Sequence, residues 1–353
     1  MTLTVVSVVG NRPQFVKQAP LAAALAEWVA LVSVDTGQHY DAELQGVFYD
    51  ELSIAPPDHV LEVGSGTHAV TTARVLERLE PILLDVRPDA VVVYGDTDST
   101  LAAALAAVKL RIPIVHVEAG LRSYDRRMPE ETNRVLVDSV STILACPSPV
   151  AAGNLRREGI VSGVEVVGDV MVDAARIFGP LADRAAGIAE RLGLEAGSYV
   201  LATVHRAANT ETGALERVVR SLSAIDRPVI LPLHPRTRAA MERAGLAFAG
   251  RVRTVPPLGY LEFTALLRGA RLVVTDSGGV QKEAYLHAVP CLTLRRETEW
   301  TETVDEGWNR LVGLDPSALA EGIEHPPRGS GGRLAYGDGF AAERIAALVA
   351  ALA

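Results

Sequence analysis

A dense group of acidic and basic side chains follows an apolar run in the first half of the chain. Residues 116–134 read HVEAGLRSYDRRMPEETNR, and the apolar stretch at 112–117 that leads into them is typical of a buried strand. Ligands of open α/β sheets bind beyond the carboxyl ends of the strands, so Glu118 and Glu130 are expected where chemistry takes place. A charge cluster can also be no more than a solvated face, but loops that alternate Arg with Glu in this way favour a functional site.

A third carboxylate follows the strand predicted at residues 90–94. The sequence GDTDST comes next, which places Asp96 at the same sheet edge and predicts that residues 98–100 cap the following helix. Clustered carboxylates raise one another's pKa, which allows one to act as an acid and another as a base near neutral pH. We therefore expect Asp96, Glu118 and Glu130 to transfer protons, although the sequence does not assign the acid and the base individually. A purely structural capping role for Asp96 is the alternative.

Cations and histidines occupy the ends of other predicted strands. Arg12 and Lys17 flank a predicted helix N-terminus in GNRPQFVK, and such an end attracts anions through its free N–H groups. His39 and His205 also follow strands, and Arg206 adds a second anion-binding group beside His205. The alternatives are a capped helix with ordinary surface cations, and histidines that only serve the fold.

A glycine pair opens a predicted helix in the second half, in VVTDSGGVQKEA. Backbone N–H groups of Ser277, Gly278 and Gly279 are expected to cradle a diphosphate, and Glu283, one turn later, can accept both hydroxyls of a ribose. The chain has no GxGxxG after its first strand and no GxxxxGK[ST], so nicotinamide, flavin and ATP chemistry lose support.

These residues need parallel strands to hold them, and the chain supplies two sets. Apolar runs alternate with helical patterns, as in βαβ units. Strands are expected at residues 3–9, 30–34, 90–94, 112–117, 143–146 and 164–167, and again at 199–203, 229–232, 252–255, 272–274, 291–294 and 310–312. Helices are expected at 20–28, 71–85, 100–110, 210–225, 236–244, 260–267, 281–286, 316–321 and 340–352. We predict an α/β protein of two doubly wound, Rossmann-like domains that face each other across a cleft.

Composition narrows the classes of partner. A length of 353 residues favours two domains, and a net charge of −9 without a long basic run disfavours nucleic acid. Two separated cysteines and eight histidines without ligand spacing predict neither disulfides nor a metal site. The chain has no signal-peptide pattern and no apolar run near the ~18 residues of a membrane span. We expect a cytoplasmic protein, not associated with a membrane, that binds a small anion.

Taken together, the motifs resemble those of the non-hydrolysing UDP-N-acetylglucosamine 2-epimerases over nearly the whole chain. The shared segments are GNRPQ (10–14), TGQH (36–39), GDT (95–97), HVEAGLRS (116–123), PEETNR (129–134), HR (205–206), DSGGVQ (276–281) and YGDG (336–339). The resemblance implies a glycosyltransferase-B-like fold in which the last helix crosses back to the first domain. The domains are then residues 1–168 with 338–353, and residues 169–337.

The resemblance also implies an activity: reversible inversion at carbon 2 of a UDP-2-acetamido sugar, by elimination and re-addition of UDP through a glycal, without a cofactor. Asp96, Glu118 and Glu130 are then the acid and base, and His205 joins the catalytic residues. Arg12, Lys17 and the glycine loop stabilise the diphosphate, and Phe263 and the Leu258 backbone contact uracil. Gln38, His39 and Arg206 match positions near an activating second site of some relatives, and a homodimer is implied. The alternative for Phe263 is a place in the core.

One departure puts the sugar in doubt. Trp300, in RRETEW (295–300), stands where many members have an arginine that contacts the nucleotide sugar, and members that act on diacetamido-uronic acids share this pattern. Arg295 and Trp300 are therefore possible sugar contacts, and Arg126, Arg127 and Arg296 can answer a substrate carboxylate.

Three rival functions remain open from the sequence. A hydrolysing epimerase releases N-acetylmannosamine and UDP, a glycosyltransferase uses the same fold, and a nucleotide-sugar sensor binds without turnover. The three carboxylates in the first half disfavour the glycosyltransferase, because an acceptor base needs only one.

Overall fold

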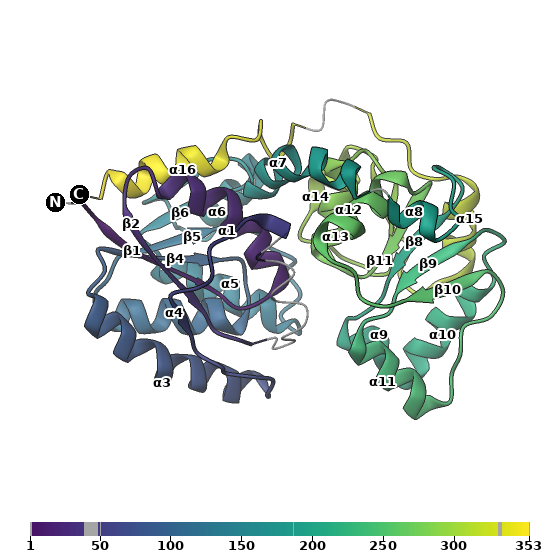
Figure 1. The fold of residues 1–353 in the computed structure, drawn as a ribbon, viewed down its shortest axis with the longest axis horizontal. Coiled ribbons are helices and arrows are strands. Elements are labelled where there is room, and N and C mark those ends of the chain that lie inside the picture. Colours follow the sequence, from purple (N-terminus) through teal and green to yellow (C-terminus); the bar gives the residue numbers. More distant parts are fainter. Residues whose placement is uncertain (1, 39–48, 50, 186, 331–333, 353) are drawn as a thin grey trace. The chain divides into compact units, whose positions relative to one another are not determined.

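The computed structural model describes residues 2–38, 49, 51–185, 187–330 and 334–352. The chain divides into two compact units, unit 1 (Met1–Ile177 and Ala335–Ala353) and unit 2 (Phe178–Leu334) (Figure 1). The boundaries differ from the predicted ones after residues 168 and 337. The first boundary falls within helix α7 (Val170–Arg184), because the first turns of this helix hold the C-terminal segment and count with unit 1.

Unit 1 contains a seven-stranded parallel sheet of order β3-β2-β1-β4-β5-β6-β7. Its strands are β1 (Thr4–Val9), β2 (Ala30–Asp35), β3 (His59–Val60), β4 (Ala90–Tyr94), β5 (Ile114–Val117), β6 (Ile143–Cys146) and β7 (Val164–Val166). Its helices are α1 (Arg12–Leu25), α3 (His68–Val86), α4 (Asp98–Lys109), α5 (Pro129–Val140), α6 (Pro149–Arg157) and α16 (Ala341–Ala350). The order of the strands reverses beside β1 and β4, which is where open α/β sheets bind ligands.

Unit 2 repeats the pattern with a six-stranded parallel sheet of order β10-β9-β8-β11-β12-β13. Its strands are β8 (Val200–Thr203), β9 (Val229–Pro232), β10 (Val252–Val255), β11 (Leu272–Thr275), β12 (Cys291–Thr293) and β13 (Asn309–Leu311). Its helices are α8 (Gly187–Arg191), α9 (Ala207–Thr210), α10 (Thr212–Ser223), α11 (Pro235–Ala244), α12 (Tyr260–Gly269), α13 (Gly278–Leu286), α14 (Thr301–Asp305) and α15 (Pro316–Glu324). The predicted α/β class and the two parallel sheets are confirmed.

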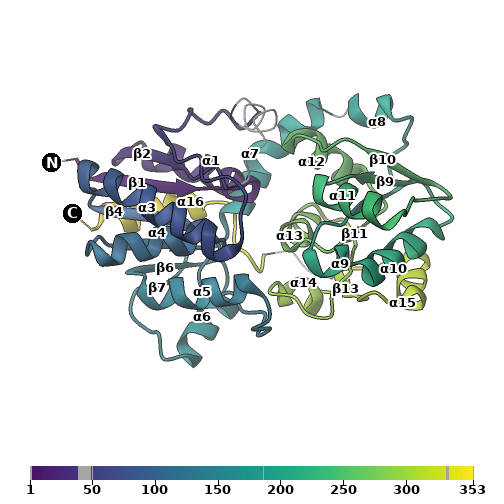
Figure 2. The same ribbon diagram turned by 90° about the horizontal axis from the view of Figure 1, so that it is seen from below.

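Alternation along the strands builds a core on each face of a sheet. In unit 2, Val200 and Ala202 pack with α10, α11 and α15, whereas Leu201 between them packs with α12 and α13 on the other face. Helices α10 and α15 lie together there (Figure 2). In unit 1, Val6 and Val8 face a core shared with α3, α4 and α5.

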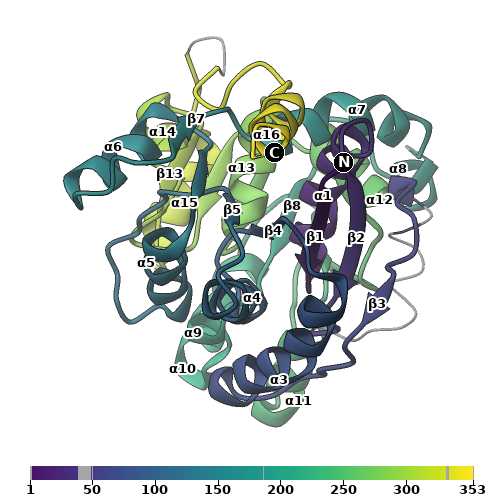
Figure 3. The ribbon, with the colours of Figure 1, turned by 90° about the vertical axis from the view of Figure 1, so that its left-hand side faces the viewer.

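The C-terminal helix α16 belongs to unit 1, as the resemblance implied. It packs against α1 (Figure 3). The returning segment is fixed by buried contacts: Asp169 N–H donates to the Tyr336 carbonyl (2.9 Å), and Gly168 and Gly337 approach so closely that a side chain at either position meets the other's backbone. The YGDG motif is thus explained by the path of the chain.

Asp173 caps α16 from a distance in sequence, which gives a prediction for stability. Its carboxylate accepts the N–H groups of Ala341 (3.2 Å) and Ala342 (2.9 Å), and burial raises its pKa. Asp173→Ala leaves these donors unpaired, so we expect a loss of about 1–3 kcal/mol in the free energy of unfolding measured in urea. Asp338→Ala, which removes an exposed pair with Arg344 and a bond from the Phe340 N–H, is the control and is expected to cost clearly less than Asp173→Ala. Equal losses in the two variants contradict the capping role.

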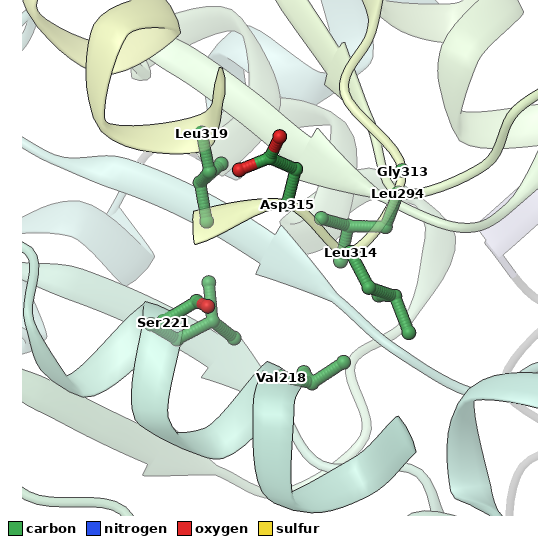
Figure 4. Close-up of a pocket in the computed structure, with 8 residues that line it drawn as sticks. Val218, Ser221, Leu294, Gly313, Leu314, Asp315 and Leu319 are labelled. Carbon is green, nitrogen blue, oxygen red and sulfur yellow. The ribbon is translucent and has the colours of Figure 1, made fainter. Parts of the chain in front are cut away.

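A small apolar cavity lies in unit 2 between α10 and the turn before α15 (Figure 4). Val218, Leu294 and Leu319 line it, and its volume of about 10 Å³ holds no more than a water molecule. It is a packing defect of the core and not a substrate site. Among the described residues, no helix has the length and apolar character needed to cross a bilayer.

Candidate active site

The turn after β1 is fastened to the end of β4 by the buried Gln14. Asn11 caps α1, whose start agrees with the helix N-terminus predicted in GNRPQFVK, and Pro13 lies in its first turn. The Gln14 side chain accepts the Gly10 N–H (2.8 Å) and donates to the Tyr94 carbonyl (2.7 Å). The carboxyl ends of the two neighbouring strands are therefore held at a fixed spacing.

Asp96 lies in the turn after β4, beside a buried arginine. The Arg134 guanidinium forms an ion pair with Asp96 and another with Glu131 (2.9 Å), and Asn133 donates to the Asp96 carbonyl (2.9 Å). The Asp96 side chain keeps 27% of its surface exposed, so it remains accessible to a ligand. The N-cap of α4 is Thr97, one residue before the predicted capping residues 98–100, because its hydroxyl accepts the N–H three residues ahead in a capping box.

Glu118 follows β5 with a φ of 73°, a left-handed conformation that is rare outside glycine. Its carboxylate forms an ion pair with Lys17, and both side chains are less than 10% exposed. In this structure the Lys17 ammonium group, which was predicted to serve a diphosphate, is paired with Glu118, and its role toward a diphosphate stays a prediction. A strained backbone held by a buried ion pair is typical of a functional residue.

The two glutamates at the start of α5 have different surroundings. Glu131 is buried and accepts N–H groups of Ser123 and Tyr124 (both 2.9 Å) besides its pair with Arg134, so it organises the loop before the helix. Glu130 is half-buried, and within the described part of the chain it forms no ion pair. Glu130 is thus the accessible member of the two.

The electrostatic picture differs from the one predicted. Mutual repulsion was expected to separate an acid from a base among Asp96, Glu118 and Glu130. The structure instead pairs Asp96 with one cation and Glu118 with another. Ion pairing, not crowding of like charges, distinguishes these two from Glu130.

Gln38 also reaches this edge of the sheet. It accepts the Ser99 hydroxyl (2.6 Å), which in turn bonds to the Thr36 hydroxyl (2.8 Å). Gln38 thereby lies beside the N-terminus of α4. His39 lies outside the described residues.

In unit 2, a fully buried Asp276 organises the turn after β8. It accepts the backbone N–H groups of His205 (3.1 Å) and Arg206 (3.0 Å) and the side-chain amide of Asn209 (3.0 Å). The His205 ring is 38% exposed, with Nδ1 at 3.5 Å from Asp276. His205 is therefore accessible and oriented from behind by a carboxylate.

The glycine loop begins α13, as predicted, but its donors are not all free. Ser277 caps the helix, and its own N–H donates to the Thr275 hydroxyl (2.9 Å). A side chain at Gly278 would collide with the Glu299 carboxylate, whereas Gly279 faces open space. Glu299 is itself held by Arg295 (2.8 Å), which explains why glycine is needed at position 278.

The residues predicted to contact uracil, and Trp300, lie in the core of unit 2. Phe263 and Leu258 belong to one apolar cluster and are 6% and 7% exposed, which agrees with the core alternative for Phe263. Trp300 is also buried, with the Lys282 ammonium 4.0 Å from its ring. Trp300 thus packs against a buried cation inside unit 2. Glu283, the predicted ribose contact, is half-buried on α13.

The sequence missed several residues that position this site: Gln14, Asn133, Arg134, Asp276 and Lys282. All five are buried and polar. Gln14, Arg134 and Asp276 also bond to residues at the ends of strands that are distant in sequence. Such contacts carry no periodic signal. Their position inside otherwise recognisable motifs is the only feature that could have drawn attention to them.

Arg122 and the cysteines complete the electrostatics. Burial disfavours the charged form of Arg122, but bonds to Glu158 and Asp138 outweigh it and raise its pKa. Burial raises the pKa of the Cys146 and Cys291 thiols to about 12, so neither is a nucleophile. No group of His, Cys, Asp and Glu within the described ranges is arranged to hold a metal ion.

Comparison with known proteins identifies the family. A model of the UDP-N-acetylglucosamine 2-epimerase family matches residues 23–350. A UDP-N-acetylglucosamine 2-epimerase homolog of Methanococcus maripaludis is 46% identical over 91% of this chain and 92% of its own. A UDP-2,3-diacetamido-2,3-dideoxy-D-glucuronate 2-epimerase of Pseudomonas aeruginosa is 45% identical over 99% of this chain and all of its own.

A solved structure of a similar protein supports the same family. The Methanocaldococcus jannaschii UDP-GlcNAc 2-epimerase, in complex with UDP-GlcNAc and UDP, matches with a TM-score of 0.92 and 38% identity, over 98% of this chain and 99% of its own. The chain belongs to the UDP-N-acetylglucosamine 2-epimerase family. The family, the enzyme class and the glycosyltransferase-B-like fold class predicted from the motifs are confirmed.

Proposed function

We propose that the protein reversibly inverts carbon 2 of a UDP-linked 2-acetamido sugar. The observation that carries this proposal is the pairing of two strand-end carboxylates with buried cations, Glu118 with Lys17 and Asp96 with Arg134. Carboxyl groups held at fixed positions suit the removal and return of a proton at carbon.

The reaction balances without a cofactor. A carboxylate takes the proton from carbon 2, the C–H electron pair forms the C1=C2 double bond of a glycal, and the C1–O bond breaks with its electrons going to the departing UDP. In the second half of the reaction a UDP oxygen attacks carbon 1 of the glycal. The electron pair of the C1=C2 double bond then takes a proton from a carboxylic acid on the opposite face of carbon 2. Asp96, Glu118 and Glu130 are proposed as the proton-transferring groups.

Stabilisation of the leaving diphosphate is the main electrostatic task. In unit 2, we assign it to His205, Arg206 and the amides of Gly278 and Gly279. In unit 1, we propose Arg12 as an anion-binding residue. Glu283 is proposed to bind the ribose, and Leu258 and Phe263 to contact uracil through the parts of these residues that stay exposed.

We propose that the sugar is either N-acetylglucosamine or a modified analogue. Both are considered because Trp300 stands where many members of the family have an arginine that contacts the nucleotide sugar. The similar Pseudomonas aeruginosa protein is named for a diacetamido uronate. Arg126 and Arg296 are exposed, and Arg127 is 88% exposed in a pair with Asp125, so a substrate carboxylate can compete for all three.

A panel of UDP-amino sugars, followed by NMR, tests function and substrate together. We expect the epimer ratio of at least one 2-acetamido sugar to reach a constant value with UDP still attached. A coupled assay for free UDP distinguishes the hydrolysing epimerase, which releases UDP with every turnover. A constant ratio only for sugars with a carboxylate at carbon 6 assigns the modified substrate, and binding of every sugar without turnover contradicts the proposal.

The oligomeric state and the cellular location of the protein are also proposed. We propose a homodimer on the basis of the family resemblance, which light scattering on the purified chain tests. We propose a cytoplasmic location, where the two free cysteines stay reduced.

A further inference from the structure

His116 is buried at the end of β5 and is bonded at both ring nitrogens. Nε2 lies 2.7 Å from the Gly95 carbonyl oxygen, and Nδ1 lies 2.7 Å from Asp138 Oδ1. Neither the His116 nor the Asp138 side chain has exposed surface. The ring therefore connects the turn that carries Asp96 to helix α5.

The partners decide how many protons the ring carries. A carbonyl oxygen only accepts, so Nε2 must donate to Gly95. Asp138 also receives donors from elsewhere: Gly120 N–H at 3.2 Å and Arg122 Nη1 at 2.7 Å. A carboxylate that is paired with an arginine and accepts a backbone N–H only accepts, so Nδ1 must donate as well. A neutral imidazole has one N–H and cannot satisfy both bonds.

The charges around the ring alternate. Arg122 also makes a two-pronged bond to Glu158 (2.7 and 2.6 Å), so the order is His116, Asp138, Arg122, Glu158. A cation at His116 is thereby balanced by Asp138, and the Asp138 carboxylate is shared with Arg122. This arrangement meets the requirement that buried charges be paired.

We propose that His116 is held as an imidazolium and is a positioning residue for the epimerase reaction, a role that rests on the proposed function. Its bond fixes the Gly95 carbonyl, next to Asp96, while the Gly95 N–H donates to the Val117 carbonyl (2.9 Å), next to Glu118. Asp138 holds the other side of the Glu118 turn through the Gly120 N–H. One buried histidine and its carboxylate thus set the spacing of two proton-transferring groups that the ring itself does not touch.

The protonation state is tested on the protein alone. In nitrogen-15 NMR of histidine-labelled protein at pH about 8, where a histidine of ordinary pKa, about 6.5, is neutral, we expect one ring with both nitrogens protonated. The spectrum of His116→Gln, which lacks that ring, assigns the signal. If His116 shows an unprotonated nitrogen, the imidazolium is wrong and the proton resides on Asp138.

The positioning role is tested by two substitutions of His116 by amide residues, each of which keeps one of the two hydrogen bonds of the ring. His116→Gln retains a donor near the Nε2 position and hence the Gly95 bond, whereas His116→Asn retains only the donor toward Asp138. We expect His116→Asn to lose about 10²-fold in kcat with KM preserved, and His116→Gln to lose clearly less. Losses that are equal, or that follow the melting temperatures of the two variants, overturn the positioning role. A wild-type protein inactive on all UDP-amino sugars overturns the proposed function and this role with it, while the NMR result still decides the imidazolium.

Discussion

Glu118→Gln is expected to reduce kcat for epimerisation by about 10²- to 10⁴-fold, the range for loss of a general acid or base, while the affinity for UDP is unchanged. The amide has the size of the carboxylate but neither gives up nor takes a proton at neutral pH. Initial rates from NMR and UDP titration by calorimetry measure the two quantities.

The substitution also leaves the buried Lys17 ammonium without its counter-ion, and an unpaired buried charge costs about 3–5 kcal/mol. The double variant Lys17→Met with Glu118→Gln removes both charges, so we expect it to recover stability but not activity. Glu165→Gln, at an exposed carboxylate of β7 in the same unit, is the matched control and should keep full activity. Recovery of activity in the double variant would show that Glu118 acts only through folding.

Arg134→Lys is expected to lower kcat by about 10²-fold, although it keeps the positive charge. Arg134 bonds Asp96 with one end of its guanidinium and Glu131 with the other, and the shorter, single ammonium group cannot hold both at these positions. Asp96 then loses its fixed orientation. Rates measured across a range of substrate concentrations separate this loss from a change in KM.

Arg156→Lys, at an exposed arginine near the end of α6, controls for the change of side chain and should leave both kinetic constants unchanged. If Arg134→Lys shows wild-type kcat, the pair with Asp96 has no part in proton transfer. The site would then depend on Glu118 and Glu130.

Strands were predicted from the sequence more completely than helices, for a physical reason. Buried parallel strands are continuous apolar runs, and of the strands in the described residues only β3 was missed, because two residues are too short to form a pattern. The helix N-terminus predicted in GNRPQFVK agrees with the start of α1 at Arg12, although the helical pattern indicated only residues 20–28, because the first turns of α1 are largely polar. Helix α5, which begins with the acidic PEE, was interpreted as part of a charged loop for the same reason.

The candidate catalytic residues could be predicted better than the side chains to which they bond. Asp96, Glu118 and Glu130 stand at strand ends or helix starts, which sequence patterns locate. Lys17 was predicted as a phosphate ligand from its place beside a helix N-terminus. Its pair with Glu118, which follows β5, was not predicted, because spacing gives no indication of a contact between segments so far apart in sequence. Arg134 and Asp276 were quoted within motifs, but only the fold shows which groups they bond.

The account depends most on the removal of hydrogen from carbon 2 as a proton by carboxylates of unit 1. Epimerisation in deuterium oxide tests this directly, with the product examined by proton NMR and mass spectrometry. We predict deuterium at carbon 2 of the product, because a proton held by a carboxylate exchanges with solvent before it returns from the other face. Product that carries only the original hydrogen at carbon 2 contradicts the elimination and re-addition route.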